Sequence, residues 1–318
     1  MRACKLLLIL LLLSSSTVFA EKKIKIAVIP KSTHPWWLKM KAGAQKAAQE
    51  QNAQIFWISP ETEDQVEKQI EFMNGLIDKT DGIVLAPLDT EKLVASVEKA
   101  MAQKKPVAIV DAMINTSKTT SFLATDNKKA GAVAAAEMAK ALTTKIQPKT
   151  KPKVAIYRFI KGIQTTDDRA LGFEEAAAKL QQFEIIREDF YAGTTEVTSI
   201  NEATRLLKKY PDLKGIFAVN WPSFENLYRA VKKTGSAGKI KLVGIDEPEA
   251  CLDGIRKGEV SAVIMQDPFN MGYLGVKAVV NALKNKPVEK HIDTGTVVIT
   301  AENIDSPEIK KALKPKSE

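Results

Sequence analysis

"IKIAVIPKSTHPWWLKMKAGAQKAA", residues 24–48, joins a short apolar run to a longer stretch with helical spacing. The run at 24–30 is typical of a strand buried on both faces, and residues 37–51 place apolar side chains three and four apart. The connection between them contains a histidine and two adjacent tryptophans. Two large rings at the end of a strand are candidates for core filling, for a protein interface or for a platform under a ligand.

The same alternation of apolar runs and helical spacing continues along the chain. Strands are expected at residues 24–30, 54–59, 82–87, 106–112, 121–126, 153–159, 183–192, 215–220, 241–246 and 261–266. Helices are expected at residues 37–51, 63–77, 91–103, 170–181, 201–210 and 224–233. Alternation of this kind predicts parallel sheets with helices on both faces. Ten strands in two runs of five favour an α/β fold with two doubly wound lobes over a single sheet.

The first twenty residues have the pattern of a cleavable signal peptide. Two basic residues precede an apolar run that is too short to span a membrane, and Val18 and Ala20 provide the small-residue cleavage pattern. We therefore expect an exported protein of a bacterial periplasm that starts at Glu21. Its net charge would be +9 minus 2, or +7, and Cys251 would be its one cysteine, without an internal disulfide.

The sequence offers little support for catalysis, cofactors, metals or nucleic acid. Two histidines, His34 and His291, cannot supply a histidine-rich metal site, and the first strand–helix connection has no glycine for a phosphate loop. The lysines are interleaved with acidic residues, as on solvated helix faces. Asp167 and Asp168 are a candidate carboxylate pair for a hydrolase, but a helix N-terminus explains them better. We expect no enzyme, no cofactor, no metal and no nucleic-acid partner.

Polar and aromatic residues recur at the carboxyl ends of the expected strands. They are His34, Trp36, Trp37, Asp111, Thr125, Asp126, Asn220, Asp246 and Gln266. Open parallel sheets bind ligands at this edge, so two facing sheets would surround one ligand. Carboxylates and amides bind hydroxyls, the planar fork of Arg169 can bridge two oxygens, and flat rings pack on C–H faces. This combination indicates a sugar.

Structural roles are alternatives for several of these residues. Asp111 and Asp246 could each cap a helix or turn, because aspartate at the end of a strand often does. Arg169 could form a structural salt bridge. One of Trp36 and Trp37 could face the core, since both stand at the start of a helix.

The chain resembles periplasmic solute-binding proteins of sugar ABC transporters, specifically the ribose-binding-protein-like group with the type I periplasmic binding protein fold. The order and spacing of many segments carry this resemblance over residues 24–313. They lie at 26–48, 80–93, 106–112, 122–127, 167–173, 215–220, 241–247, 262–272 and 297–309.

The resemblance implies two lobes joined by a three-strand hinge. The N-terminal lobe would hold residues 21–125 plus 267–293, and the C-terminal lobe residues 126–266 plus 294–318. The crossings would fall near Thr125, Gln266 and Thr294. The lysine-rich stretch at 143–153 would then be a loop inside the second lobe and not a domain boundary.

The resemblance implies that the ligand pocket falls on residues already named as candidates. They are His34, Trp36, Trp37, Asp111, Arg169, Asn220, Asp246 and Gln266. Relatives commonly have Asn in place of His34 and phenylalanines in place of the tryptophans. Ala112 replaces an Arg of the ribose binders, and Trp221 is expected at the pocket mouth or hinge. These departures leave the ligand open between a pyranose, another polyol and a non-sugar solute.

The function implied is a monomeric, non-enzymatic receptor that binds a small polyhydroxylated ligand, most simply a monosaccharide, between closing lobes. The closed form would dock on a membrane ABC permease. The alternative is a sensory receptor of the same fold that presents its closed form to a histidine kinase or a chemoreceptor.

Overall fold

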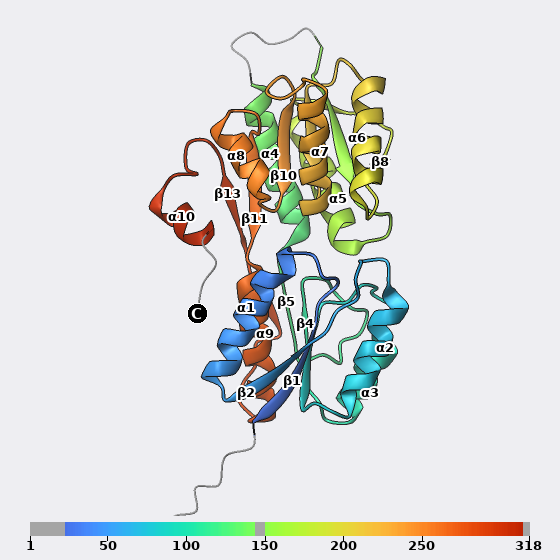
Figure 1. Ribbon diagram of the computed structural model, residues 1–318, viewed down its shortest axis with the longest axis vertical. Coiled ribbons are helices and arrows are strands. Elements are labelled where there is room, and N and C mark those ends of the chain that lie inside the picture. The colour runs from blue at the N-terminus through green and yellow to red at the C-terminus, as the bar shows by residue number, and fades with distance from the viewer. Residues whose placement is uncertain (1–22, 144–149, 314–318) are drawn as a thin grey trace, which may run out of the picture.

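The computed structural model describes residues 23–143 and 150–313, and its ribbon shows two lobes stacked end to end (Figure 1). Each lobe is a sheet covered by helices on both faces. The segment expected to be a signal peptide lies outside the described residues, as does most of the lysine-rich stretch at 143–153. None of the described helices is both long enough and apolar enough to cross a membrane.

The N-terminal lobe is built on a six-stranded parallel sheet in the order β12-β5-β4-β3-β1-β2. Its strands are β1 (Ile24–Ile29), β2 (Ala53–Trp57), β3 (Gly82–Leu85), β4 (Val107–Val110), β5 (Ser121–Ala124) and β12 (His291–Asp293). One face packs against α1 (Trp36–Glu50) and α9 (Pro268–Leu283), and the other against α2 (Val66–Ile77) and α3 (Val94–Ala102). Because helices cover both faces, the central strands are apolar throughout.

The C-terminal lobe has the sheet order β13-β11-β10-β9-β6-β7, with β8 also paired to β6. Its strands are β6 (Lys153–Arg158), β7 (Glu184–Ile185), β8 (Phe190–Tyr191), β9 (Gly215–Ala218), β10 (Lys241–Ile245), β11 (Ala262–Gln266) and β13 (Thr296–Ile299). One face carries α4 (Asn127–Leu142) and α5 (Gln164–Leu180). The other carries α6 (Glu196–Lys209), α7 (Trp221–Lys233), α8 (Glu249–Arg256) and α10 (Pro307–Leu313).

The predicted α/β fold with two doubly wound lobes is confirmed, with three differences in the strands. The single strand expected at 183–192 is wrong, because the exposed Arg187 and Asp189 interrupt it and leave two short strands that both pair with β6. β12 and β13 were not among the expected strands, since both are short and largely exposed. β13 also runs antiparallel to β11, so the second sheet is not wholly parallel.

The chain passes between the sheets three times. It leaves the first sheet after Ala124, returns after Gln266, and crosses again between Asp293 and Thr296. The first and third crossings are neighbours, because the Thr294 backbone N–H donates to the Ala124 carbonyl at 3.0 Å. These crossings lie beside the positions expected from the sequence; their action as a hinge and the lobe boundaries remain predictions.

Paired glycines let one helix pair in each lobe pack backbone against backbone. A Cβ on Gly131 of α4 would lie 2.0 Å from the Arg169 carbonyl oxygen in α5, and one on Gly172 would approach α4 as closely. Gly43 of α1 and Gly272 of α9 form the same contact in the other lobe. This close approach fixes the start of α5, and with it Arg169, against α4.

Candidate ligand-binding site

All eight residues predicted to bind a ligand line one pocket between the lobes. The N-terminal lobe contributes His34, Trp36, Trp37 and Asp111, and the C-terminal lobe contributes Arg169, Asn220, Asp246 and Gln266. Trp221, expected at the pocket mouth or hinge, also lines the pocket, and the sequence interpretation did not assign five further residues to it: Lys31, Glu63, Thr165, Thr166 and Pro222. The structure therefore brings the predicted set together, while its role in binding remains a prediction.

Asp111 and Asp246 occupy equivalent positions in the two lobes. Asp111 follows β4 and Asp246 follows β10, the fourth strands of their lobes in chain order, apart from the short β8. Both have left-handed backbone conformations, with φ of 65° and 70°. Such angles are uncommon for residues other than glycine and gather at functional sites. Both carboxylates line the pocket, and neither aspartate is the N-cap residue of a described helix, although Asp246 accepts the first backbone N–H of α7.

Asp111 is held by a buried ion pair. Its Oδ2 lies 2.7 Å from Lys31 Nζ, and both side chains are less than a tenth exposed. Lys31 lies two residues after the end of β1, so the pair ties the ends of β1 and β4 together within one lobe. Loss of either partner would destabilise the fold strongly, because the remaining charge would be buried without compensation.

Asp246 instead accepts three hydrogen bonds from uncharged groups. Gln266 Nε2 and the Trp221 backbone N–H donate from its own lobe at 2.7 and 2.9 Å. The third donor is the Trp36 indole Nε1, at 3.0 Å, which reaches across from the other lobe. Asp246 therefore connects the two lobes through the pocket.

The two tryptophans combine the core and pocket roles that the sequence left open. Trp36 and Trp37 are 5% and 3% exposed, contact the core under α1, and meet edge to face with ring centroids 4.7 Å apart. Both also line the pocket. The Trp37 side chain bonds Glu63, whose pKa is raised by burial despite the nearby Lys31 cation.

His34 is a neutral donor at the pocket. Burial lowers its pKa, although the nearby Asp246 carboxylate opposes this effect. Its Nδ1 accepts the Trp36 backbone N–H at 3.2 Å, so the ring proton resides on Nε2. The His34 ring also meets the Trp221 ring edge to face across the lobes, with centroids 5.5 Å apart.

Arg169 and Asn220 are oriented by neutral neighbours. Arg169 donates from Nε to Asn127 Oδ1 at 2.8 Å and from Nη1 to the Val219 carbonyl at 3.0 Å, not to a carboxylate. Asn220 Oδ1 caps α7 by accepting the Ser223 backbone N–H at 3.2 Å. The amide group of Asn220 can then donate to a ligand while its oxygen holds the helix.

Two other carboxylates lie near the pocket without lining it. Asp167 stands in the first turn of α5 and accepts the Gly162 backbone N–H at 3.0 Å, as expected for a helix N-terminus. Asp126 caps α4. Within residues 23–143 and 150–313, no group of three or more histidine, cysteine, aspartate or glutamate side chains could hold a metal ion.

The pocket offers hydrogen-bond acceptors, donors and apolar ring surface together. The carboxylates of Asp111 and Asp246 face donors from Arg169 and Asn220, and indole rings form part of the wall. Carboxylates bind hydroxyl groups strongly, and aromatic faces suit C–H surfaces. The arrangement is suited to a small polyhydroxylated molecule held by many directional bonds.

Comparison with known proteins supports this interpretation. Residues 26–287 match the family described as "Periplasmic binding protein domain". The chain is 27% identical to the D-allose-binding periplasmic protein of Escherichia coli, over 87% of this chain and 89% of that protein. It is 29% identical to the ribose import binding protein RbsB of Bacillus subtilis, over 81% of each chain.

Two solved structures are similar over nearly their whole length. One is an ABC transporter solute-binding protein of Agrobacterium vitis with bound D-fucose, with TM-score 0.83 and 33% identity, covering 90% of this chain and 98% of that one. The other is a carbohydrate transporter solute-binding protein of Agrobacterium radiobacter with D-arabinose, with TM-score 0.87 and 26% identity, covering 93% and 100%. The relatives named are binding proteins and not enzymes, and the chain belongs to the periplasmic binding protein family.

Proposed function

We propose that this protein is a periplasmic receptor that binds a monosaccharide or related polyol between its two lobes. The observation that carries the proposal is the meeting of eight polar and aromatic side chains, from both lobes, around one pocket. Relatives with bound D-fucose and D-arabinose support a monosaccharide as the ligand class.

In this proposal the ligand exchanges with the Trp36 indole at Asp246. The pocket encloses about 40 Å³, whereas a cavity of about 150 Å³ holds a molecule as small as benzene. A sugar therefore enters while the lobes are parted, and the lobes close on it with the Trp36 indole displaced from Asp246. A sugar hydroxyl then replaces the indole N–H, and Asp111, held by Lys31, receives hydroxyls from the other side.

The lobes close by rotation at the crossings near Thr125, Gln266 and Thr294, with boundaries at residues 125/126, 266/267 and 293/294. Only the closed form presents both carboxylates to one ligand, so the ligand shifts the population toward it. The protein is exported through the segment at 1–20, acts as a monomer in the periplasm, and delivers its ligand to an ABC permease. The D-allose and ribose import proteins among its relatives support this role.

Calorimetric titration of ligand-stripped protein against pentoses, hexoses and polyols tests binding. We expect one sugar to bind with a dissociation constant on the order of micromolar, equal to about 8 kcal/mol. Three of the four tryptophans line the pocket, so intrinsic fluorescence should change with the same constant. The absence of binding across the panel would contradict the proposal.

A matched pair of variants assigns the site. Asp111→Asn should weaken sugar binding by about tenfold or more, because a charge-assisted bond is lost. Asp168→Asn makes the same change beside the pocket but outside its lining, and should leave affinity unchanged. Equal effects of both variants would refute the assignment. Loss of uptake of that sugar in a deletion strain would support transport over sensing.

A further inference from the structure

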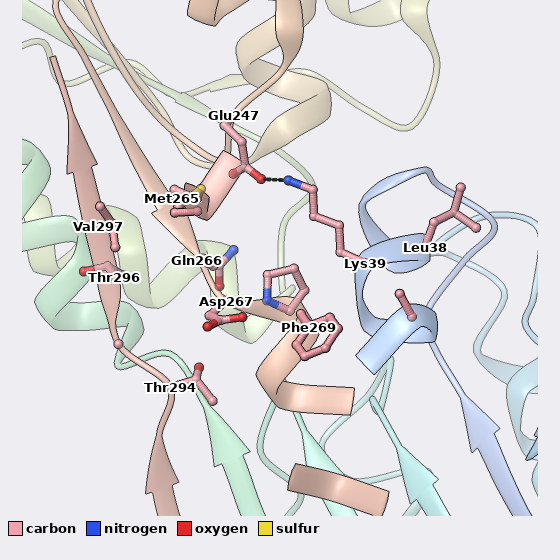
Figure 2. A pocket seen from close by; sticks show the side chains of 14 residues that line it. Leu38, Lys39, Glu247, Met265, Gln266, Asp267, Phe269, Thr294, Thr296 and Val297 are labelled. Atoms are coloured by element: carbon pink, nitrogen blue, oxygen red, sulfur yellow. Dashed lines mark hydrogen bonds and ion pairs between the residues drawn. The ribbon is translucent and has the colours of Figure 1, made fainter. Parts of the chain in front are cut away.

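A second cavity lies at the hinge, beside the proposed sugar pocket. It measures about 390 Å³, within the range of ~300–1,000 Å³ typical of small-molecule pockets. Figure 2 shows its walls, with Leu38 of α1 and Val297 of β13 on opposite sides. These two apolar side chains are 57% and 39% exposed, and Met265 and Phe269 line the interior. The cavity is thus largely apolar, with an exposed apolar rim.

Three polar atoms of the cavity lining are buried without a partner. Glu247 Oε2, Gln266 Oε1 and Thr294 Oγ1 have no hydrogen-bond partner among the described residues. Glu247 and Gln266 are each only 4% exposed. A buried polar atom without a bond is costly, and a bound molecule or an ordered water that reaches it supplies the missing bond. Gln266 Oε1 and the ionised Glu247 carboxylate accept only, and the threonine hydroxyl can do either.

The walls come from both lobes. Leu38 and Lys39 belong to α1 in the first lobe, whereas Glu247 and Val297 belong to the second. An ion pair between Lys39 and Glu247 joins the lobes on one side of the cavity (Figure 2). Asp267, the other charged residue of the lining, accepts the backbone N–H and the side-chain amide of Asn270 at 3.0 and 2.7 Å. Because the charged groups already have partners within the protein, the cavity suits an uncharged ligand. A molecule held there contacts both lobes at once.

Gln266 connects this cavity to the sugar pocket, because it lines both. Its Nε2 donates to Asp246 at 2.7 Å in the sugar pocket, while its Oε1 is one of the unpartnered atoms. A donor that binds Oε1 would fix the amide in the orientation that supports Asp246.

We propose that the hinge cavity is a second binding site, for a small uncharged molecule with an apolar body and at least two hydrogen-bond donors. Occupation of this site stabilises the closed lobes and thereby tightens binding in the sugar pocket. The coupling to sugar binding rests on the proposed function, whereas the existence of the second site does not. Coupling between two sites is reciprocal, so the sugar tightens binding in the hinge cavity by the same factor.

The first experiment uses catechol and o-xylene and needs no sugar. The two probes have nearly the same shape, but only catechol has donors. Titrations of protein with ¹³C-labelled methionine methyl groups should shift the Met265 signal, because Met265 lines the cavity. We expect catechol to bind about tenfold tighter than o-xylene, as one or two extra hydrogen bonds provide. Equal binding of the two probes, or no shift of Met265, would overturn the site.

Two threonine variants give a matched control. Thr294 and Thr125 both lie on crossings and both have buried hydroxyls without a partner in the described chain, but only Thr294 lines this cavity. Thr294→Val should weaken catechol binding by about three- to tenfold, and Thr125→Val by less than about twofold. Ala312→Phe, which fills the cavity from α10, should abolish it. Unchanged catechol affinity in both Thr294→Val and Ala312→Phe would refute the assignment.

The second experiment measures coupling with whichever sugar the calorimetric panel identifies. Saturating catechol should tighten sugar binding by about fivefold, within the usual range of coupling, and Ala312→Phe should remove the effect. Catechol binding without coupling would retain the site and overturn its link to closure. Competition between catechol and sugar would place the probe in the sugar pocket and overturn the proposal.

Discussion

The two lobes carry equivalent aspartates that the protein treats differently. Asp111 and Asp246 share the end of a fourth strand, a left-handed backbone and burial. Asp111 is paired with the Lys31 cation inside its own lobe, whereas Asp246 accepts only neutral donors, one of them from the opposite lobe. The Asp111 carboxylate is thus held by its own lobe before the lobes close. The hydrogen bond from the Trp36 indole to Asp246 forms only when the two lobes are together.

This difference assigns the lobes different tasks. A buried charge with a buried partner is rigid, because separating the two costs several kcal/mol. A neutral hydrogen bond contributes about 1 kcal/mol net, so the Trp36 indole can be exchanged for a ligand hydroxyl at little cost. We infer that the N-terminal lobe presents a preformed acceptor and that the C-terminal lobe responds to the ligand.

The largest effect is expected when the cation that pairs with Asp111 is removed. Lys31→Met leaves Asp111 buried without its cation and should lower the free energy of unfolding by about 3–5 kcal/mol. Gln266→Met removes one neutral donor from Asp246 and should cost only about 1 kcal/mol. Urea denaturation measures both. The double variant Lys31→Met/Asp111→Asn should recover much of the loss, and equal losses for the two single variants would contradict the distinction.

The next effect concerns the ion pair between the lobes. Burial raises the pKa of Glu247 from 4.5 to about 7, against the opposing effect of Lys39, and the adjacent Asp246 adds to the rise. The folded protein therefore keeps a proton that the unfolded chain has released. This contribution to stability is complete below pH 4.5 and is lost as the pH rises through 7, which amounts to roughly 3 kcal/mol.

Denaturation of Glu247→Gln at several pH values tests this expectation. The variant should lack the fall in unfolding free energy that the wild type shows between pH 4.5 and pH 7. Glu259→Gln is a control on the same lobe, since Glu259 bonds Tyr228 away from the interface between the lobes. Parallel pH profiles for the wild type and Glu247→Gln would exclude a raised pKa at this residue.

The sequence predicted the doubly wound fold and the members of the site because both follow from local patterns. Apolar runs define the strands, and the carboxyl ends of parallel strands meet at one edge. Lys31 was missed because a lysine after a strand is ordinarily solvated, and Glu63 because the sequence pattern places it at the start of a helix, where a glutamate is ordinarily solvated. The charge of both residues was a signal that the sequence offered, since charged groups in a pocket are usually paired with groups of opposite charge.

Other features depend on the relative placement of the lobes, which no local pattern encodes. The bond from Trp36 to Asp246 and the contact of His34 with Trp221 cross between residues about two hundred positions apart. Short, exposed strands such as β12 and β13 have no apolar run to reveal them. The hinge cavity is likewise formed by segments from both ends of the chain.

A smaller effect is expected when the ring at the interface between the lobes is removed. Trp36→Ala deletes both the aromatic wall and the bond to Asp246. Sugar affinity should fall by roughly 1–3 kcal/mol, as for other aromatic platforms. Calorimetry with the identified sugar measures the change. Normal affinity with a lowered melting temperature would instead assign the ring to the core alone.

The smallest effect separates the ring from its N–H group. Trp36→Phe keeps an aromatic face but cannot donate to Asp246, so the ligand no longer competes with the protein for that carboxylate. We expect affinity about threefold tighter than that of the wild type, as the loss of one weak competing bond implies. A tenfold loss would show that the indole N–H serves the ligand and not Asp246.

Crystallography of the sugar complex tests the central claim most directly, through the distance between Trp36 Nε1 and Asp246 Oδ1. The two atoms are 3.0 Å apart here. With sugar bound between the lobes, we expect them to move beyond hydrogen-bond distance, with a ligand hydroxyl on Asp246 and another on Asp111. A bound sugar that leaves this bond intact, or that contacts one lobe only, would contradict the account.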